Sequence, residues 1–221
     1  MMEYTMRPGE IALWVLKYLG IMLLYTLLDV ALWRKAFPGQ ARWLNLLTMG
    51  LCLAGYLALL EQAGRMPKLF ADMSLPDIGL ALACSVGFFL LLDKGLDPLL
   101  AGVFPQSETG YQTALDHLRQ SPAASLLQVC LLAPVAEEIL MRGVVLGGLR
   151  ESLGVTAALL ISSALFAAFH FTMVQTLSAL VCGVVLGLLY IKADSVFCCI
   201  LAHAGYNFIS WMGMLEIFHA K

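Results

Sequence analysis

Residues 123–149 read AASLLQVCLLAPVAEEILMRGVVLGGL, an apolar run that carries two carboxylates and one guanidinium near its centre. A helix of this length is long enough to cross the roughly 30 Å of hydrocarbon in a bilayer. A charged side chain at mid-bilayer costs roughly 2.5–3.5 kcal/mol on insertion scales, so it turns toward a protein interior or a wet cavity. The stretch therefore predicts a membrane helix whose charged face meets other helices.

The rest of the chain has the same apolar character. Of its 221 residues, 61% are apolar and 13% are charged, whereas soluble domains have ~45–50% and about 25%. Lipid allows only helices and closed barrels, and barrel strands would show ~10-residue alternating segments. We therefore predict an all-α bundle of seven to eight transmembrane helices in a single domain, residues 1–221, with the motif-bearing core at 123–218. The other apolar runs are 11–33, 44–60, 78–92, 153–171, 174–191 and 196–218.

Two polar connections are expected between these runs. Residues 34–42 hold three basic residues between Trp33 and Trp43, which predicts an interfacial loop with aromatic anchors. Residues 93–122 carry four acids, and we expect a short interfacial helix at 111–120 within them. The counts of Lys and Arg on the two sides are too similar to fix the orientation in the membrane.

Helix geometry separates the two glutamates of the opening stretch. Glu138 and Arg142 are four residues apart, so they share a face and can pair. Glu137 is rotated by about 100° from Glu138. This predicts a structural Glu138–Arg142 pair and leaves Glu137 free to act as a general base. The alternative is one buried ion network that contains all three side chains.

Two later apolar runs also carry polar side chains at helical spacing. Phe166 and His170 are four residues apart, as are His203 and Asn207. Taken alone, each pair could be packing or hydrogen-bonded contacts between helices. Together, three late helices each bring a polar cluster with a group capable of acid–base chemistry. That distribution is expected of a catalytic centre assembled from facing helices.

The sequence Gly-Val-Val-Leu-Gly occurs at 143–147 and again at 183–187. Each copy is a G-x-x-x-G motif, which lets helix backbones approach closely. We interpret both copies as packing surfaces rather than as traces of a duplication. The six cysteines lack the spacing of zinc ligands, and we interpret them as apolar core residues.

The polar residues also form three short motifs, which together resemble those of a known family. The motifs are E-E-x-x-x-R at Glu137, Glu138 and Arg142, F-x-x-x-H at Phe166 and His170, and H-x-x-x-N at His203 and Asn207. In order and spacing the chain is similar to the CPBP intramembrane proteases, also called the CAAX protease and bacteriocin-processing or Abi family. That family includes the type II CAAX prenyl endopeptidases. The resemblance rests on residues 137–207.

The resemblance implies peptide-bond hydrolysis in a cavity among the helices. By match to the family, Glu137 and His170 activate water, and His203 and Asn207 stabilise the oxyanion. A positioned base contributes ~10²–10⁴-fold to the rate and an oxyanion donor ~10²–10³-fold. Glu138 and Arg142, the other two residues of the first motif, are also expected to belong to the site.

Metal dependence has two alternatives. Glu137, His170 and His203 could form a three-ligand zinc site with an open water position, and Glu138 would then have to serve as the base. H-E-x-x-H is absent, so no independent metal motif supports zinc. We favour a water activated by glutamate, with no bound metal or other cofactor.

The sequence thus predicts an intramembrane endopeptidase, of metallo or glutamate type, with membrane lipid and a hydrophobic or lipidated peptide or protein as partners. A net charge of −2 gives no indication of a nucleic-acid partner. We expect a multi-pass protein of a bacterial cell membrane. A transporter or channel would use the buried charges as an ion path, but no inverted repeat of broken helices is evident. A non-catalytic membrane scaffold is the third alternative.

Overall fold

A computed structural model describes residues 6–70, 73–170 and 172–219, except for the side chains of 108, 111 and 216–219. The described part is helical and has no strand, which confirms the all-α prediction. The first half contains α1 (Pro8–Leu28), the π-helical η1 (Asp29–Trp33), α2 (Arg34–Ala36), α3 (Ala41–Gln62), α4 (Leu75–Phe88), the π-helical η2 (Phe89–Leu96), α5 (Asp97–Val103) and α6 (Pro105–Arg119). The second half contains α7 (Pro122–Leu127), the π-helical η3 (Gln128–Leu132), α8 (Ala133–Glu138), the π-helical η4 (Ile139–Leu146), α9 (Gly147–Leu153), α10 (Val155–Ala168), α11 (Met173–Ala193) and α12 (Val196–His219).

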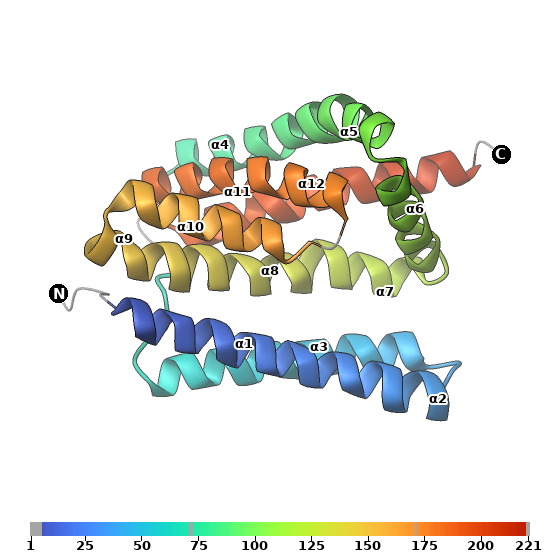
Figure 1. Ribbon diagram of the computed structural model, residues 1–221, viewed down its shortest axis with the longest axis horizontal. Coiled ribbons are helices and arrows are strands. Elements are labelled where there is room, and N and C mark those ends of the chain that lie inside the picture. Colours follow the sequence, from blue (N-terminus) through green and yellow to red (C-terminus); the bar gives the residue numbers. More distant parts are fainter. Residues whose placement is uncertain (1–5, 71–72, 171, 220–221) are drawn as a thin grey trace.

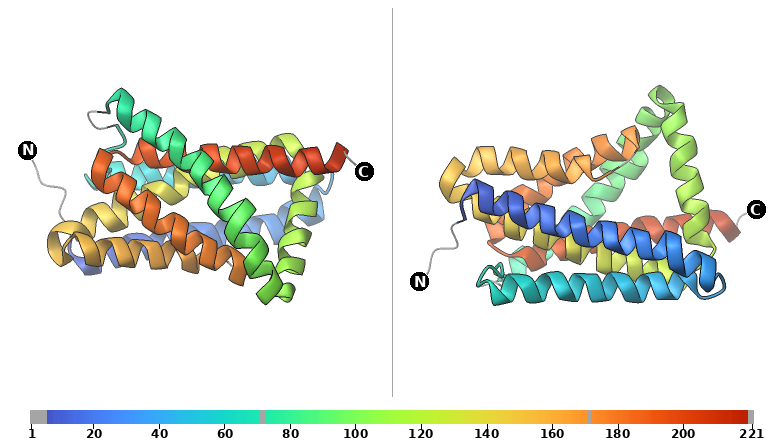
Figure 2. Two further views of the ribbon diagram at one scale, coloured as in Figure 1. Left: turned by 90° about the horizontal axis from the view of Figure 1, so that it is seen from above. Right: turned by 60° about the horizontal axis from the view of Figure 1, so that its bottom comes forward.

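The helices lie roughly side by side in layers (Figures 1 and 2). The α1–α3 hairpin forms one outer layer, and the continuous helix from α7 to α9 lies next to it. Beyond that helix, α10 packs on α11, and α12 packs on α4. The short helix α6 runs across one end of the bundle. The three motif-bearing segments, α8–η4, α10 and α12, therefore meet in the interior.

Among the described residues, five helices are long and apolar enough to cross a membrane by length and composition. The other two predicted runs are also helical. Residues 123–149 belong to one continuous helix, with the charged centre turned inward. Within the run at 153–171, residues 155–168 form the shorter helix α10, whose 14 residues are fewer than the ~20 that a perpendicular span needs, and residue 171 lies outside the described residues. The five candidate spans are Pro8–Ala36, Ala41–Gln62, Leu75–Val103, Met173–Ala193 and Val196–Leu215.

The loop predicted at residues 34–42 is wrong for most of its length. The first helix continues through η1 and α2 to Ala36, and a short turn leads to α3. Arg34 forms an ion pair with Asp29 at 2.6 Å, and Trp33 donates a hydrogen bond to Thr48 on α3 at 3.0 Å. These contacts satisfy the polar groups at the helix end, so the helix extends further than its apolar residues alone would indicate.

The connection predicted at 93–122 is also shorter than expected. Asp93 and Asp97 lie inside the continuous helix α4–α5, and only Phe104 separates that helix from α6. The helix predicted at 111–120 is present as the longer α6. Both aspartates have hydroxyl partners on neighbouring helices, so they are accommodated within a spanning segment.

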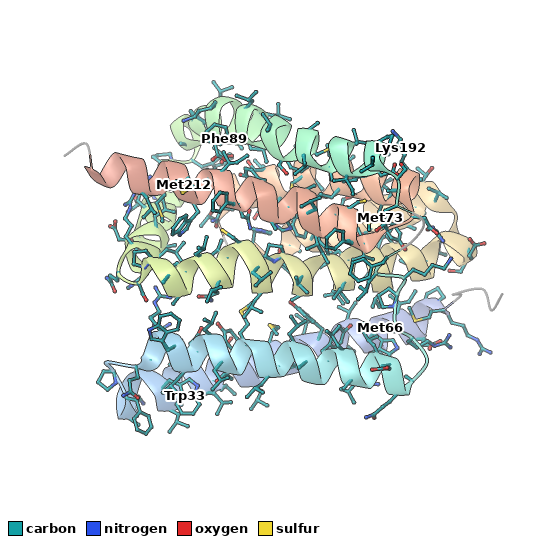
Figure 3. All side chains as sticks on the ribbon, turned by 180° about the vertical axis from the view of Figure 1, so that it is seen from behind. Trp33, Met66, Met73, Phe89, Lys192 and Met212 are labelled. Atoms are coloured by element: carbon teal, nitrogen blue, oxygen red, sulfur yellow. The ribbon has the colours of Figure 1, made fainter. Side chains whose placement is uncertain are left out.

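The connection between α3 and α4 joins the two layers. Met66 and Met73 pack against the core, and Figure 3 shows both at the end of the hairpin opposite Trp33. Pro67 covers Gly143 on η4, where an added Cβ would lie 2.6 Å from the proline ring. The Leu69 carbonyl accepts the backbone N–H of Phe197 at 3.0 Å. This segment therefore fixes the hairpin against the helices that carry the motifs.

Both G-x-x-x-G motifs are packing surfaces, as predicted. A Cβ at Gly183 would lie 3.1 Å from the Ser163 Cα, and one at Gly187 would lie 2.3 Å from a Leu159 methyl group. These contacts bring α11 onto α10 at close range. A Cβ at Gly147 would meet the Tyr190 hydroxyl at 2.7 Å. The small residues therefore permit backbone approaches that larger side chains would block.

Gly183→Ala is expected to destabilise the protein by about 1–3 kcal/mol, because α10 and α11 must move apart to admit the methyl group. Thermal unfolding in detergent measures the change. Gly20→Ala on α1 is the matched control, since no atom lies within 4 Å of its added Cβ. Alanine is favoured over glycine in a helix by about 0.5–1 kcal/mol, so the control should be slightly more stable. Equal melting temperatures for the two variants would contradict this packing.

Candidate active site

Glu138 is the centre of a buried ion cluster. Its Oε2 lies 3.0 Å from Arg142 Nη1, and its Oε1 lies 2.8 Å from His203 Nδ1. The side chains of Glu138 and Arg142 are both 0% exposed. Arg142 Nη2 also donates to the Gly183 carbonyl at 3.1 Å. The predicted Glu138–Arg142 pair is therefore present, and it also holds α12 and α11 in place.

Glu137 points to a different side of the same helix. Its Oε2 lies 4.0 Å from His203 Nε2, and its side chain is 27% exposed. His170 and His203 are both close enough to interact with it electrostatically. Glu138 thus binds one ring nitrogen of His203, while Glu137 faces the other. The rotation between neighbouring helical residues, about 100°, produces this division.

Phe166 is the packing centre of the three motifs. Its ring centroid lies 5.2 Å from that of His170 and 5.7 Å from that of His203, both in edge-to-face arrangements. The Arg142 guanidinium carbon lies 4.7 Å from the same centroid. Phe166 is 2% exposed. The sequence indicated only its spacing from His170, and its contacts with two other helices were missed.

His170 follows the last turn of α10. Its Nδ1 lies 3.0 Å from the Phe166 carbonyl oxygen, which can only accept a hydrogen bond. In a neutral imidazole the proton is therefore on Nδ1, and Nε2 keeps a lone pair. The His170 carbonyl accepts the Thr176 hydroxyl at 2.9 Å, which ties the turn to α11. The ring is thus oriented with a basic nitrogen available.

Asn207 fills a gap in the backbone hydrogen bonding of η3. The Ala133 N–H bonds to the Gln128 carbonyl, in the π-helical register. The next donor in that register would be Pro134, which has no N–H. Asn207 Nδ2 donates to the Val129 carbonyl, which this register leaves without a backbone donor, at 2.8 Å. The amide is therefore fixed by one N–H, and its second N–H is left for other partners.

Tyr18 brings the first helix to the site. Its ring stacks on Phe169 with centroids 6.2 Å apart and planes at 2°, beside the catalytic candidate His170. It also meets Tyr56 of α3 edge-on at 5.4 Å. Tyr18 is buried and interacts electrostatically with Glu137. The sequence did not predict that Tyr18 lies at the site, because this position depends on how the α1–α3 hairpin packs.

The histidine contacts determine which ring nitrogens could bind zinc in the zinc alternative. Among the described residues, no group of three or more His, Cys, Asp or Glu side chains is placed to hold a metal ion. His170 and His203 each use Nδ1 for a contact inside the protein, so only their Nε2 atoms could serve as ligands.

Comparison with known proteins agrees with the motif analysis. A family model described as type II CAAX prenyl endopeptidase Rce1-like matches residues 119–209, a segment that contains all three motifs. No curated protein and no solved structure gives a significant match. The long apolar helices and the family match indicate an integral membrane protein. Through residues 119–209, less than half of its length, the chain is therefore similar to the type II CAAX prenyl endopeptidases, the resemblance that its motifs predicted.

Proposed function

We propose that this protein hydrolyses a peptide bond of a membrane-associated or lipidated substrate, with Glu137 and His170 activating water and His203 and Asn207 stabilising the oxyanion. The observation that carries the proposal is the two-sided contact of His203. Glu138 holds its Nδ1 at 2.8 Å, and this aims its Nε2 toward Glu137 at 4.0 Å. A base and an oxyanion donor thus face each other across a short space.

The contact with Glu138 also determines what His203 can do. A carboxylate accepts the proton on Nδ1, so neutral His203 would present only a lone pair at Nε2. The ring can therefore donate to an oxyanion only as imidazolium. Glu138 forms an ion pair with Arg142, and Glu137 lies 4.0 Å from His203 Nε2. In the proposed reaction His203 therefore acts as the imidazolium, held between the two carboxylates.

The reaction then needs no further groups. A water held between Glu137 and His170 Nε2 gives a proton to the Glu137 carboxylate as its oxygen attacks the carbonyl carbon. The resulting oxyanion accepts hydrogen bonds from His203 Nε2–H and from the second N–H of Asn207. Glu137 then passes the proton to the leaving amine as the C–N bond breaks. The base is expected to contribute ~10²–10⁴-fold and each oxyanion donor ~10²–10³-fold.

Cleavage of a quenched hydrophobic peptide library by purified protein in liposomes tests the proposal. We expect activity that Asn207→Ala lowers by about 10²–10³-fold. Gly20→Ala, on the outer face of α1, is the control for a fold-neutral substitution. Treatment with a chelator should leave the rate unchanged. Stoichiometric zinc whose removal abolishes activity would overturn the metal-free chemistry, and ion flux without cleavage would favour a transporter.

A further inference from the structure

Two carboxylates lie inside a membrane-spanning helix but outside the three motifs. Asp93 is in η2, and its Oδ1 accepts the Tyr206 hydroxyl at 2.8 Å while its Oδ2 accepts the Ser210 hydroxyl at 2.5 Å. Asp97 accepts the hydroxyl of Ser178 on α11. Intramembrane carboxylates are costly and mark functional positions by default. The proposed reaction uses neither of them.

The partners of Asp93 share the helix that carries the oxyanion pair. Tyr206 lies between His203 and Asn207 in the sequence, and Ser210 lies one turn further along the same face. Figure 3 shows Phe89 of η2 and Met212 of α12 at the same end of the bundle, where these two elements meet. Asp93 therefore holds two successive turns of α12, beginning next to Asn207.

Helix α4 contacts the same side of α12 one turn earlier. The Ser85 hydroxyl donates to the Ala202 carbonyl at 2.9 Å, and a Cβ at Gly205 would lie 2.5 Å from its oxygen. Phe88 meets the Tyr206 ring edge-on, with centroids 5.8 Å apart. With side chains reaching about 5–6 Å from the helix axis, a rotation of ~10° moves a polar atom by about 1 Å. A displacement of that size can cost on the order of 10²-fold in rate.

We propose that Asp93 is a positioning residue for the oxyanion pair. Through the hydroxyls of Tyr206 and Ser210 it fixes the rotation of α12 and so holds His203 and Asn207 toward Glu137. The inference rests on the proposed function of those residues. Asp97 accepts a hydroxyl in the same way from Ser178 on α11, a helix that carries none of the proposed catalytic residues, and this contact provides an internal control.

Tyr206→Phe tests the proposal, because it keeps the ring against Phe88 and removes one hydroxyl. We expect kcat to fall about 10-fold at unchanged KM, since the oxyanion donors act in the transition state. In an Asn207→Ala background the same substitution should lower kcat by a smaller factor, because only His203 of the oxyanion pair remains to be misplaced. Ser178→Ala should leave kcat unchanged. Equal effects of Tyr206→Phe in both backgrounds, or none in either, would overturn the proposal.

A second measurement does not require activity. Selective ¹⁵N-histidine labelling reports the hydrogen bond between His203 and Glu138 through the imidazole nitrogen shifts. We expect Tyr206→Phe to move the His203 signals and Ser178→Ala to leave them in place, whereas unmoved signals in Tyr206→Phe would refute the positioning role. If the unmodified protein cleaves no peptide, the proposed function fails, and these shifts still decide whether Asp93 orients His203.

Discussion

Glu137→Gln is expected to lower kcat by about 10²–10⁴-fold and to leave the melting temperature unchanged. The substitution keeps the size of the side chain and removes its ability to take a proton. Glu137 is 27% exposed and lies 4.0 Å from His203 Nε2, so it carries little of the packing. Initial rates on a quenched peptide and a thermal unfolding curve measure the two quantities.

The neighbouring Glu138→Gln provides the contrast. Glu138 is 0% exposed and holds both Arg142 and His203, so its amide should lower stability as well as activity. Both substitutions should lower the rate, so the melting temperature distinguishes the catalytic role of Glu137 from the structural role of Glu138. If the Glu137→Gln protein kept more than about a third of the kcat, Glu137 would not be the base that takes the proton from water.

Arg142→Met is expected to destabilise the protein by about 3–5 kcal/mol, because it leaves the Glu138 carboxylate buried without its guanidinium partner. Both side chains are 0% exposed, and the guanidinium also bonds to the Gly183 carbonyl and lies 4.7 Å from the centroid of the Phe166 ring. Equilibrium unfolding in mixed micelles gives the change in free energy.

Two controls isolate the cause of that loss. The double variant Glu138→Gln with Arg142→Met should recover part of the stability, because no uncompensated charge remains in the interior. Arg150→Met breaks an ion pair with Asp194 at 2.8 Å, in which the side chains are 28% and 41% exposed, and it should cost less than about 1 kcal/mol. An Arg142→Met protein as stable as Arg150→Met would contradict the structural role.

The features that were predictable from the sequence are those that depend on neighbouring residues. The pairing of Glu138 with Arg142 and the different direction of Glu137 follow from the periodicity of one helix. The contact of Glu138 with His203 joins residues 65 positions apart, so it depends on how α12 packs. The motifs identified His203 as a site residue. Only the tertiary structure shows that Glu138 occupies its Nδ1, so that His203 can donate from Nε2 only as the imidazolium.

Helix boundaries were the least predictable part, for a related reason. Asp93 and Asp97 were assigned to a polar connection because charges are costly in lipid. The structure keeps them in a spanning helix, where hydroxyls on α12 and α11 satisfy them. Likewise, Asn207 was assigned to the oxyanion alone. The absence of an N–H at Pro134 gives it a structural bond to Val129 as well.

Cleavage of a hydrophobic peptide in H₂¹⁸O by the protein in liposomes, with Glu137→Gln beside it, tests the central claim most directly. The proposed reaction puts one ¹⁸O atom from water into the new carboxyl terminus of the product, which mass spectrometry detects. We expect the labelled fragment from the unmodified protein and a loss of at least about 10²-fold from Glu137→Gln. Equal amounts of labelled product from both proteins would contradict a water activated by Glu137 in the membrane.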